Sequence, residues 1–222
     1  MSNLAVSIDI REWTHQLDSL GRALLNGQIN ALAWQNGMED LYCSIDLATL
    51  LQSIDFKHMI NNSDFNYIDQ GRTFTPVKFL PETGAPENMV VETRATKVPK
   101  GVSIFPHGHL NMVSAFVTLS GEFHFRQYDR LHLDENFFHI RLSSDHYSQP
   151  GQWNTQSEDK NNVHWFTAMT DDTYLFSTKL QRVDPNQYCA SNMFVDINGK
   201  DLGDGVIQAE RIDFDRAKEL YD

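Results

Sequence analysis

The chain has 222 residues, and 41% of them are hydrophobic, which is enough to bury one sizeable core. Its formal net charge of -12 at pH 7 argues against a nucleic-acid partner, because binding to the phosphate backbone needs a basic face. The first ten residues lack the charged start and apolar core of a secretory signal, and no apolar run approaches the roughly 20 residues that span a bilayer. We therefore expect a cytoplasmic protein with no membrane partner.

The N-terminal part of the chain has helical patterns. Over residues 9–25 apolar side chains recur at steps of three and four, and Asp9 and Glu12 are placed as a capping box. A second helical pattern follows Asp46, and a shorter one comes after it. We predict a helical N-terminal extension over residues 1–70.

After the extension the pattern changes to short segments rich in β-branched and aromatic residues. Many short strands separated by turns are typical of an all-β sandwich or barrel. We assign the barrel to residues 71–183 and expect residues 184–222 to pack on it as a C-terminal tail, with a short helix behind Asp213. The expected strands are 73–79, 89–96, 102–105, 113–119, 122–128, 137–141, 163–169 and 173–180.

Two connections are also predicted. Ser120-Gly121 lies between two expected strands and fits a two-residue hairpin turn, because Gly tolerates the positive φ that such turns need. The segment 147–162 is polar and contains Pro150-Gly151, so we expect a long loop that forms a rim or a lid.

Three histidines are the strongest indication of chemistry. His107 and His109 are two residues apart in a β-rich region, so both imidazoles lie on one face of a strand. His164 begins a later strand, and the interior of a barrel brings such distant residues together. Three neutral imidazoles leave coordination positions open on iron, manganese, nickel, copper or zinc. The sequence therefore predicts a metal site formed by His107, His109 and His164.

The arrangement resembles the cupin superfamily. Gly101 is followed by five residues and then His107-Gly108-His109, with Gly121 further on, as in the first cupin motif. The position where that motif has a glutamate holds Ser114. Within the cupins the pattern looks like the thiol dioxygenases, in particular the cysteamine dioxygenase and plant cysteine oxidase branch. Across residues 101–170 that resemblance is carried by the three histidines, Met112, Gly121, His124, Tyr128-Asp129, Asn162-Val163 and Phe166-Thr167-Ala168.

The resemblance implies a cupin barrel, which is a jelly-roll-like double-stranded β-helix, with Fe(II) on the three histidines. It implies a dioxygenase that oxidises a small thiol with O2 to a sulfinic acid. Zinc, manganese and nickel are the alternative metals. The Gly-Gly before the third histidine and the Pro-Pro-Tyr after it, both expected in that branch, are absent, so the substrate stays open.

Other residues are weighed for roles around the metal. Tyr128 and Asn162 are candidates for orienting the substrate or a ligating imidazole. Arg94, Arg126, Arg130 and Arg141 lie on or beside expected strands, and for each of them the outer face of the barrel is favoured over the interior.

Two rival functions fit the same sequence. One is a metal-dependent cupin enzyme that acts on a small molecule other than a thiol. The other is a ligand-binding cupin without enzymatic activity, since one fold hosts many functions.

Overall fold

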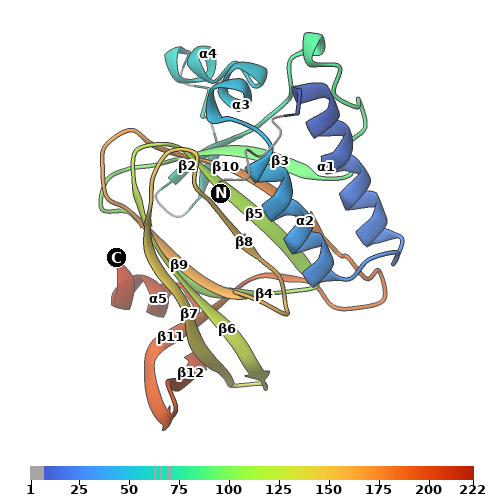
Figure 1. Ribbon diagram of the computed structural model, residues 1–222. Coiled ribbons are helices and arrows are strands. Elements are labelled where there is room, and N and C mark those ends of the chain that lie inside the picture. The colour runs from blue at the N-terminus through green and yellow to red at the C-terminus, as the bar shows by residue number, and fades with distance from the viewer. Residues whose placement is uncertain (1–7, 63, 66, 70–71) are drawn as a thin grey trace, which may run out of the picture.

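The computed structural model describes residues 8–62, 64–65, 67–69 and 72–222, and in these residues helices flank an arrangement of β-sheets (Figure 1). The helices are α1 (Ile10–Leu25), α2 (Ala31–Cys43), α3 (Leu47–Ser53), α4 (Phe56–Asn61), the 3-10 helix η1 (Pro81–Thr83) and α5 (Phe214–Tyr221). The strands are β1 (Tyr67–Asp69), β2 (Arg72–Pro76), β3 (Glu92–Val98), β4 (Ser103–Leu110), β5 (Met112–Ser120), β6 (Phe123–Leu133), β7 (Phe137–Ser148), β8 (Trp153–Gln156), β9 (Val163–Ala168), β10 (Thr173–Gln181), β11 (Ala190–Gly203) and β12 (Val206–Arg211).

The strands form two antiparallel sheets. The first has the order β1-β2-β3-β10-β5-β8. The second has the order β11-β12-β7-β6-β9-β4 and closes on itself, because β11 also pairs with β4. Side chains from both sheets meet in a shared core that includes Leu175 of the first sheet and Phe125 and Phe166 of the second. The layer between the sheets is where a ligand can be enclosed.

The first sheet is covered on its other face by the N-terminal helices (Figure 1). On β5, Val113 and Ala115 pack in the same core as Trp13 of α1. Their neighbours Ser114 and Phe116 point to the opposite face, between the sheets, because side chains alternate along a strand. The capping of α1 is as expected, since the side chain of Asp9 accepts a hydrogen bond from the backbone N–H of Glu12.

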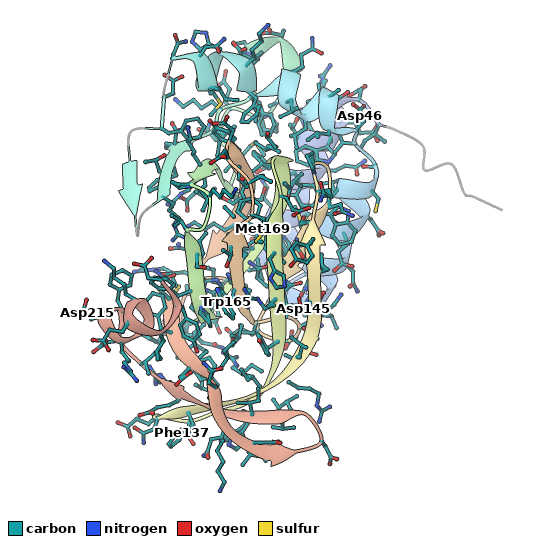
Figure 2. The ribbon with its side chains drawn as sticks, turned by 90° about the vertical axis from the view of Figure 1, so that its left-hand side faces the viewer. Asp46, Phe137, Asp145, Trp165, Met169 and Asp215 are labelled. Carbon is teal, nitrogen blue, oxygen red and sulfur yellow. The ribbon has the colours of Figure 1, made fainter. Side chains whose placement is uncertain are left out.

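The second sheet encloses a separate core. Tyr128, Phe138, Val163 and Val195 are among its buried side chains. Helix α5 packs beside this barrel through Ala217 and Tyr221, and Asp213 caps it as predicted. Figure 2 shows the start of β7, marked by Phe137, at one end of the molecule and Asp46, which caps α3, at the other.

Residues 184–222, expected as a tail, contribute β11 and β12 to the second sheet. The division of the chain into 1–70, 71–183 and 184–222 stays a prediction.

Two sequence-based expectations about connections are wrong, and one helix was not predicted. Helix α2 was missed, because Gly37 interrupts its apolar pattern, although Asn30 caps it by accepting from the N–H of Ala33. The segment 147–162 is not all loop, since β8 pairs with β5. Ser120-Gly121 does not join a hairpin, because β5 pairs with β8 and β10 whereas β6 pairs with β7 and β9. The turn instead carries the chain from one sheet to the other.

Among the residues that the structure describes, no helix is both long enough and apolar enough to cross a membrane.

Candidate metal centre

The three predicted histidines lie together. His107 and His109 come from β4 and His164 from β9, and His107 is the register partner of His164. The ring centroids of His107 and His164 are 4.3 Å apart, and each is 4.9 Å from that of His109. One ring nitrogen from each residue can be chosen so that all three lie within 4.8 Å of one another. All three side chains are buried.

The strand geometry explains why His107 and His109 share a face. Gly108 stands between them, and a Cβ there would lie 2.7 Å from Oδ1 of Asn162 and 2.8 Å from Phe138. A larger residue at this position would therefore push β4 away from its neighbours. A register shift between Ile104 and His107 then aligns His107 with His164.

Backbone carbonyls orient two of the imidazoles. Nδ1–H of His107 donates to the carbonyl oxygen of Phe105 at 2.7 Å, and Nδ1–H of His164 donates to that of Asn162 at 3.3 Å. Because a carbonyl can only accept, both rings carry their proton on Nδ1 and offer Nε2 as the ligand atom. Nδ1 of His109 is buried and has no hydrogen-bond partner. A buried ring nitrogen without a partner fits a centre that a metal ion completes.

The electrostatics of the site favour neutral imidazoles. Burial holds the pKa of His109 well below its usual value, and the neighbouring His107 lowers it further. Burial has the same effect on the pKa of His164, with His107 and His109 adding to it. The neutral form is the one that binds metal ions. The donor set therefore fits a divalent transition metal.

Ser114 stands at the wall of the same cavity. Its side chain is buried on β5, and Nε2 of Gln156 donates to its Oγ at 2.8 Å. No Asp or Glu is among the described residues that line the cavity. A divalent ion on three neutral imidazoles would thus keep its full charge and attract an anionic ligand.

The cavity has a volume of about 320 Å³ and lies between the two sheets. That volume is at the lower end of the range for small-molecule sites. Its apolar lining includes Phe116, Phe166 and Leu175, and its basic lining consists of Arg72, Arg94 and Lys179. The expectation that Arg94 lies on the outer face is wrong, because β3 turns this side chain toward the cavity.

The backbone carbonyl oxygen of His109 accepts hydrogen bonds from two side chains. The donors are Arg130 Nη1 and Asn162 Nδ2, both at 3.0 Å. Arg130 also pairs with Glu158 at 2.9 Å, and Glu158 accepts a short hydrogen bond from the backbone N–H of Asn111. The segment after β8 is thereby tied to the strand end that carries His109.

The two residues expected to orient the substrate or a ligating imidazole lie in different places. Asn162 is fully buried and contacts the histidines through its backbone carbonyl and its amide, so it can position them. Tyr128 does not line the cavity; its ring packs inside the second sheet with Phe138 and Val163. A register shift between Gln127 and Tyr128 accompanies this placement.

Arg126 and His124 lie on the outer face of the second sheet. The guanidinium of Arg126 is 3.1 Å from the ring centroid of Trp165. His124 pairs with Asp145 at 2.5 Å and stacks on Tyr147. Trp165 and Asp145 mark this face in Figure 2. None of these side chains reaches the metal centre.

No protein-family model and no curated protein matches the chain. Solved structures are similar over about half of its length. KdgF from Halomonas sp. is 13% identical, with 54% of this chain and 88% of that chain covered and a TM-score of 0.39. An RmlC-like cupin from Shewanella frigidimarina is 15% identical, with 52% and 82% covered and a TM-score of 0.36. Procruciferin, an 11S globulin from Brassica napus, is 12% identical, with 53% and 27% covered and a TM-score of 0.38.

These similarities concern the fold alone. The described residues themselves show an all-β core of one open sheet and one closed barrel, and helices α1 to α4 precede it in the chain.

Proposed function

We propose that the protein is a mononuclear non-haem Fe(II) dioxygenase that oxidises a small thiol to a sulfinic acid. The observation that carries the proposal is the buried set of three histidines, with Ser114 where the cupin motif has a glutamate. The resemblance of residues 101–170 to the thiol dioxygenases supports it. His107, His109 and His164 would hold the ion, which supplies the activation of dioxygen when it is bound.

The overall reaction is R–SH + O2 → R–SO2H. The O–O bond breaks, two S–O bonds form, and the sulfur loses the four electrons that dioxygen gains. The thiol has to enter as a thiolate, and the positive charge near the histidines favours that form. Phe116 and Phe166 shield the site from bulk water, because both line the cavity and pack against each other with ring centroids 5.6 Å apart.

The test is metal analysis followed by oxygen consumption. Protein purified without a histidine tag should contain close to one equivalent of iron, or accept it on reconstitution, and should consume one O2 per thiol oxidised. Zinc, manganese or nickel together with activity under argon would instead support a cupin enzyme of another class. Absence of any stoichiometric metal would favour a binding protein.

Single substitutions test whether the cavity histidines, and not exposed ones, bind the metal. His107→Ala and His164→Ala should each abolish stoichiometric metal binding and thiol-dependent oxygen uptake. His58→Ala is the matched control, because His58 is exposed on α4 far from the cavity lining. If both cavity variants keep full occupancy, the metal-site proposal is wrong.

A further inference from the structure

The positive charge in the cavity comes from the sheet opposite the histidines. Arg94 lies on β3 and Lys179 on β10 of the first sheet, whereas the three histidines belong to the second sheet. Both cations line the same cavity as the histidines. Their wall and the histidine wall therefore enclose one small ligand space with two chemically different ends.

One carboxylate forms ion pairs with both cations. Glu92 pairs with Arg94 through a short contact and with Lys179 at 3.5 Å. Glu92 is half-exposed and is not among the residues that line the cavity, so the negative charge sits behind the cations. A single carboxylate shared by two cations leaves a net positive charge facing the cavity.

Lys179 is the more enclosed of the two cations. Its side chain is 17% exposed, compared with 31% for Arg94. Burial lowers the pKa of Lys179, which is the usual effect of removing an ammonium group from water. A partly desolvated ammonium beside a cavity interacts more strongly with an anion than an exposed one does. This is a notable arrangement in a chain with a net charge of -12.

We propose that the cavity selects a thiol that carries a carboxylate, with Lys179 and Arg94 binding the carboxylate and the thiol facing the three histidines. This inference rests on the proposed function for the thiol end only. The described lining residues include no acid that could receive a substrate ammonium group, so a mercaptocarboxylate without an amine fits best.

Three thiols of similar length test the charge preference without any change to the protein. They are 3-mercaptopropionate, 2-mercaptoethanol and cysteamine, with an anionic, a neutral and a cationic end. Binding is measured by anaerobic calorimetry on the iron-loaded protein and on the metal-free protein. We expect 3-mercaptopropionate to bind roughly tenfold or more tightly than 2-mercaptoethanol, because a charge-assisted contact is worth at least that factor. Cysteamine should bind most weakly, in both forms of the protein.

Two substitutions test whether Lys179 and Arg94 cause the preference for the anionic thiol. Lys179→Met keeps the length and the apolar stem of the side chain but removes its charge, and Arg94→Gln removes the second cation. Each should lower the ratio of the 2-mercaptoethanol Kd to the 3-mercaptopropionate Kd by roughly tenfold. Lys97→Met is the control on β3, because Lys97 pairs with Asp172 and does not line the cavity. The control should keep the wild-type ratio, and unfolding curves show whether each variant is folded.

The outcomes separate this inference from the proposed function. Equal affinity for the three thiols, a preference for cysteamine, or no binding of 3-mercaptopropionate would overturn the carboxylate site. A charge preference that is lost in Lys179→Met but without oxygen uptake would uphold the carboxylate site and contradict the dioxygenase. Oxygen uptake with all three thiols, bound at equal affinity, would contradict the carboxylate site and uphold the dioxygenase.

Discussion

His107 and His164 stand opposite each other in the register of β4 and β9, and their ring centroids are 4.3 Å apart. Residues directly opposite in an antiparallel pair project to the same face, so the sheet itself places both rings toward the cavity. His109 joins them from two positions along β4. The centre thus depends on one strand pair, and metal binding should be coupled to the stability of that pair.

Metal addition should stabilise the folded protein. A ligand that binds only the native state adds about 2.7 kcal/mol when its free concentration is a hundred times its Kd. Thermal unfolding followed by circular dichroism, with and without Fe(II) under argon, measures this as a rise in Tm. The rise should disappear in His164→Ala and persist in His58→Ala. A Tm that is the same with metal and with chelator in the wild type would contradict a metal centre formed by these histidines.

Ser114→Glu should change the ligand set. The carboxylate would lie at the cavity wall, where Gln156 already donates to the side chain at this position. We expect tighter metal binding, because an anionic fourth ligand offsets the charge of the ion, and slower thiol oxidation, because that ligand takes a position the thiolate needs. Competition with a chelator gives the affinity, and oxygen uptake gives the rate.

The control for this substitution is Ser114→Ala, which removes the hydroxyl without adding a ligand. It should bind metal as the wild type does. If Ser114→Glu has wild-type affinity and rate, the side chain at position 114 does not face the ion.

Local sequence patterns predicted most of the strands and the shared face of His107 and His109, but they did not predict β8, β11 or β12. His107 and His109 are two residues apart, and the alternation that places them on one face is a local property of a strand. The approach of His164 depends on strand pairing between distant segments, which the cupin-like spacing of Gly101, Gly121 and His164 indicated. The exchange between sheets at Gly121 had no local signal, because the same two residues could close a hairpin.

The basic end of the cavity was not predicted. Lys179 has the same strand parity as Leu175 and Ser177, both of which line the cavity, so its position on β10 was a usable signal. Arg94 gave no such signal, because polar side chains occur on both faces of β3, with Thr93 and Lys97 on one face and Thr96 on the other. The role of Glu158 depends on a contact across the chain with Asn111 and Arg130, and no pattern in the sequence marks it.

Glu158→Gln should weaken both the fold and the metal centre. The change removes the charge that pairs with Arg130, whose side chain is only 10% exposed. Arg130 is then less firmly positioned to donate its hydrogen bond to the carbonyl oxygen of His109. We expect a loss of about 1–3 kcal/mol in the free energy of unfolding of the metal-free protein, as for other charged hydrogen bonds that lose a partner. Metal affinity should fall with it, measured by chelator competition.

Arg216→Gln is the matched control for the ion pair. It breaks an exposed pair with Glu219 on α5, and such pairs contribute little. The control should leave both the urea midpoint and the metal affinity unchanged. Wild-type metal affinity in Glu158→Gln would show that Glu158 supports the fold without positioning His109.

The stability of the metal-free protein should fall as the pH drops below the ordinary histidine pKa of 6.5. Burial depresses the pKa of His109 and His164 in the folded state, so between that depressed value and 6.5 the unfolded chain binds more protons. Protons then favour unfolding, and stability rises with pH through this window and levels off above it. Each histidine contributes at most about 1.4 kcal/mol per pH unit. Urea unfolding in chelator at a series of pH values should give a shallower slope for His164→Gln than for the wild type. Equal slopes would mean that His164 is not held neutral by its burial.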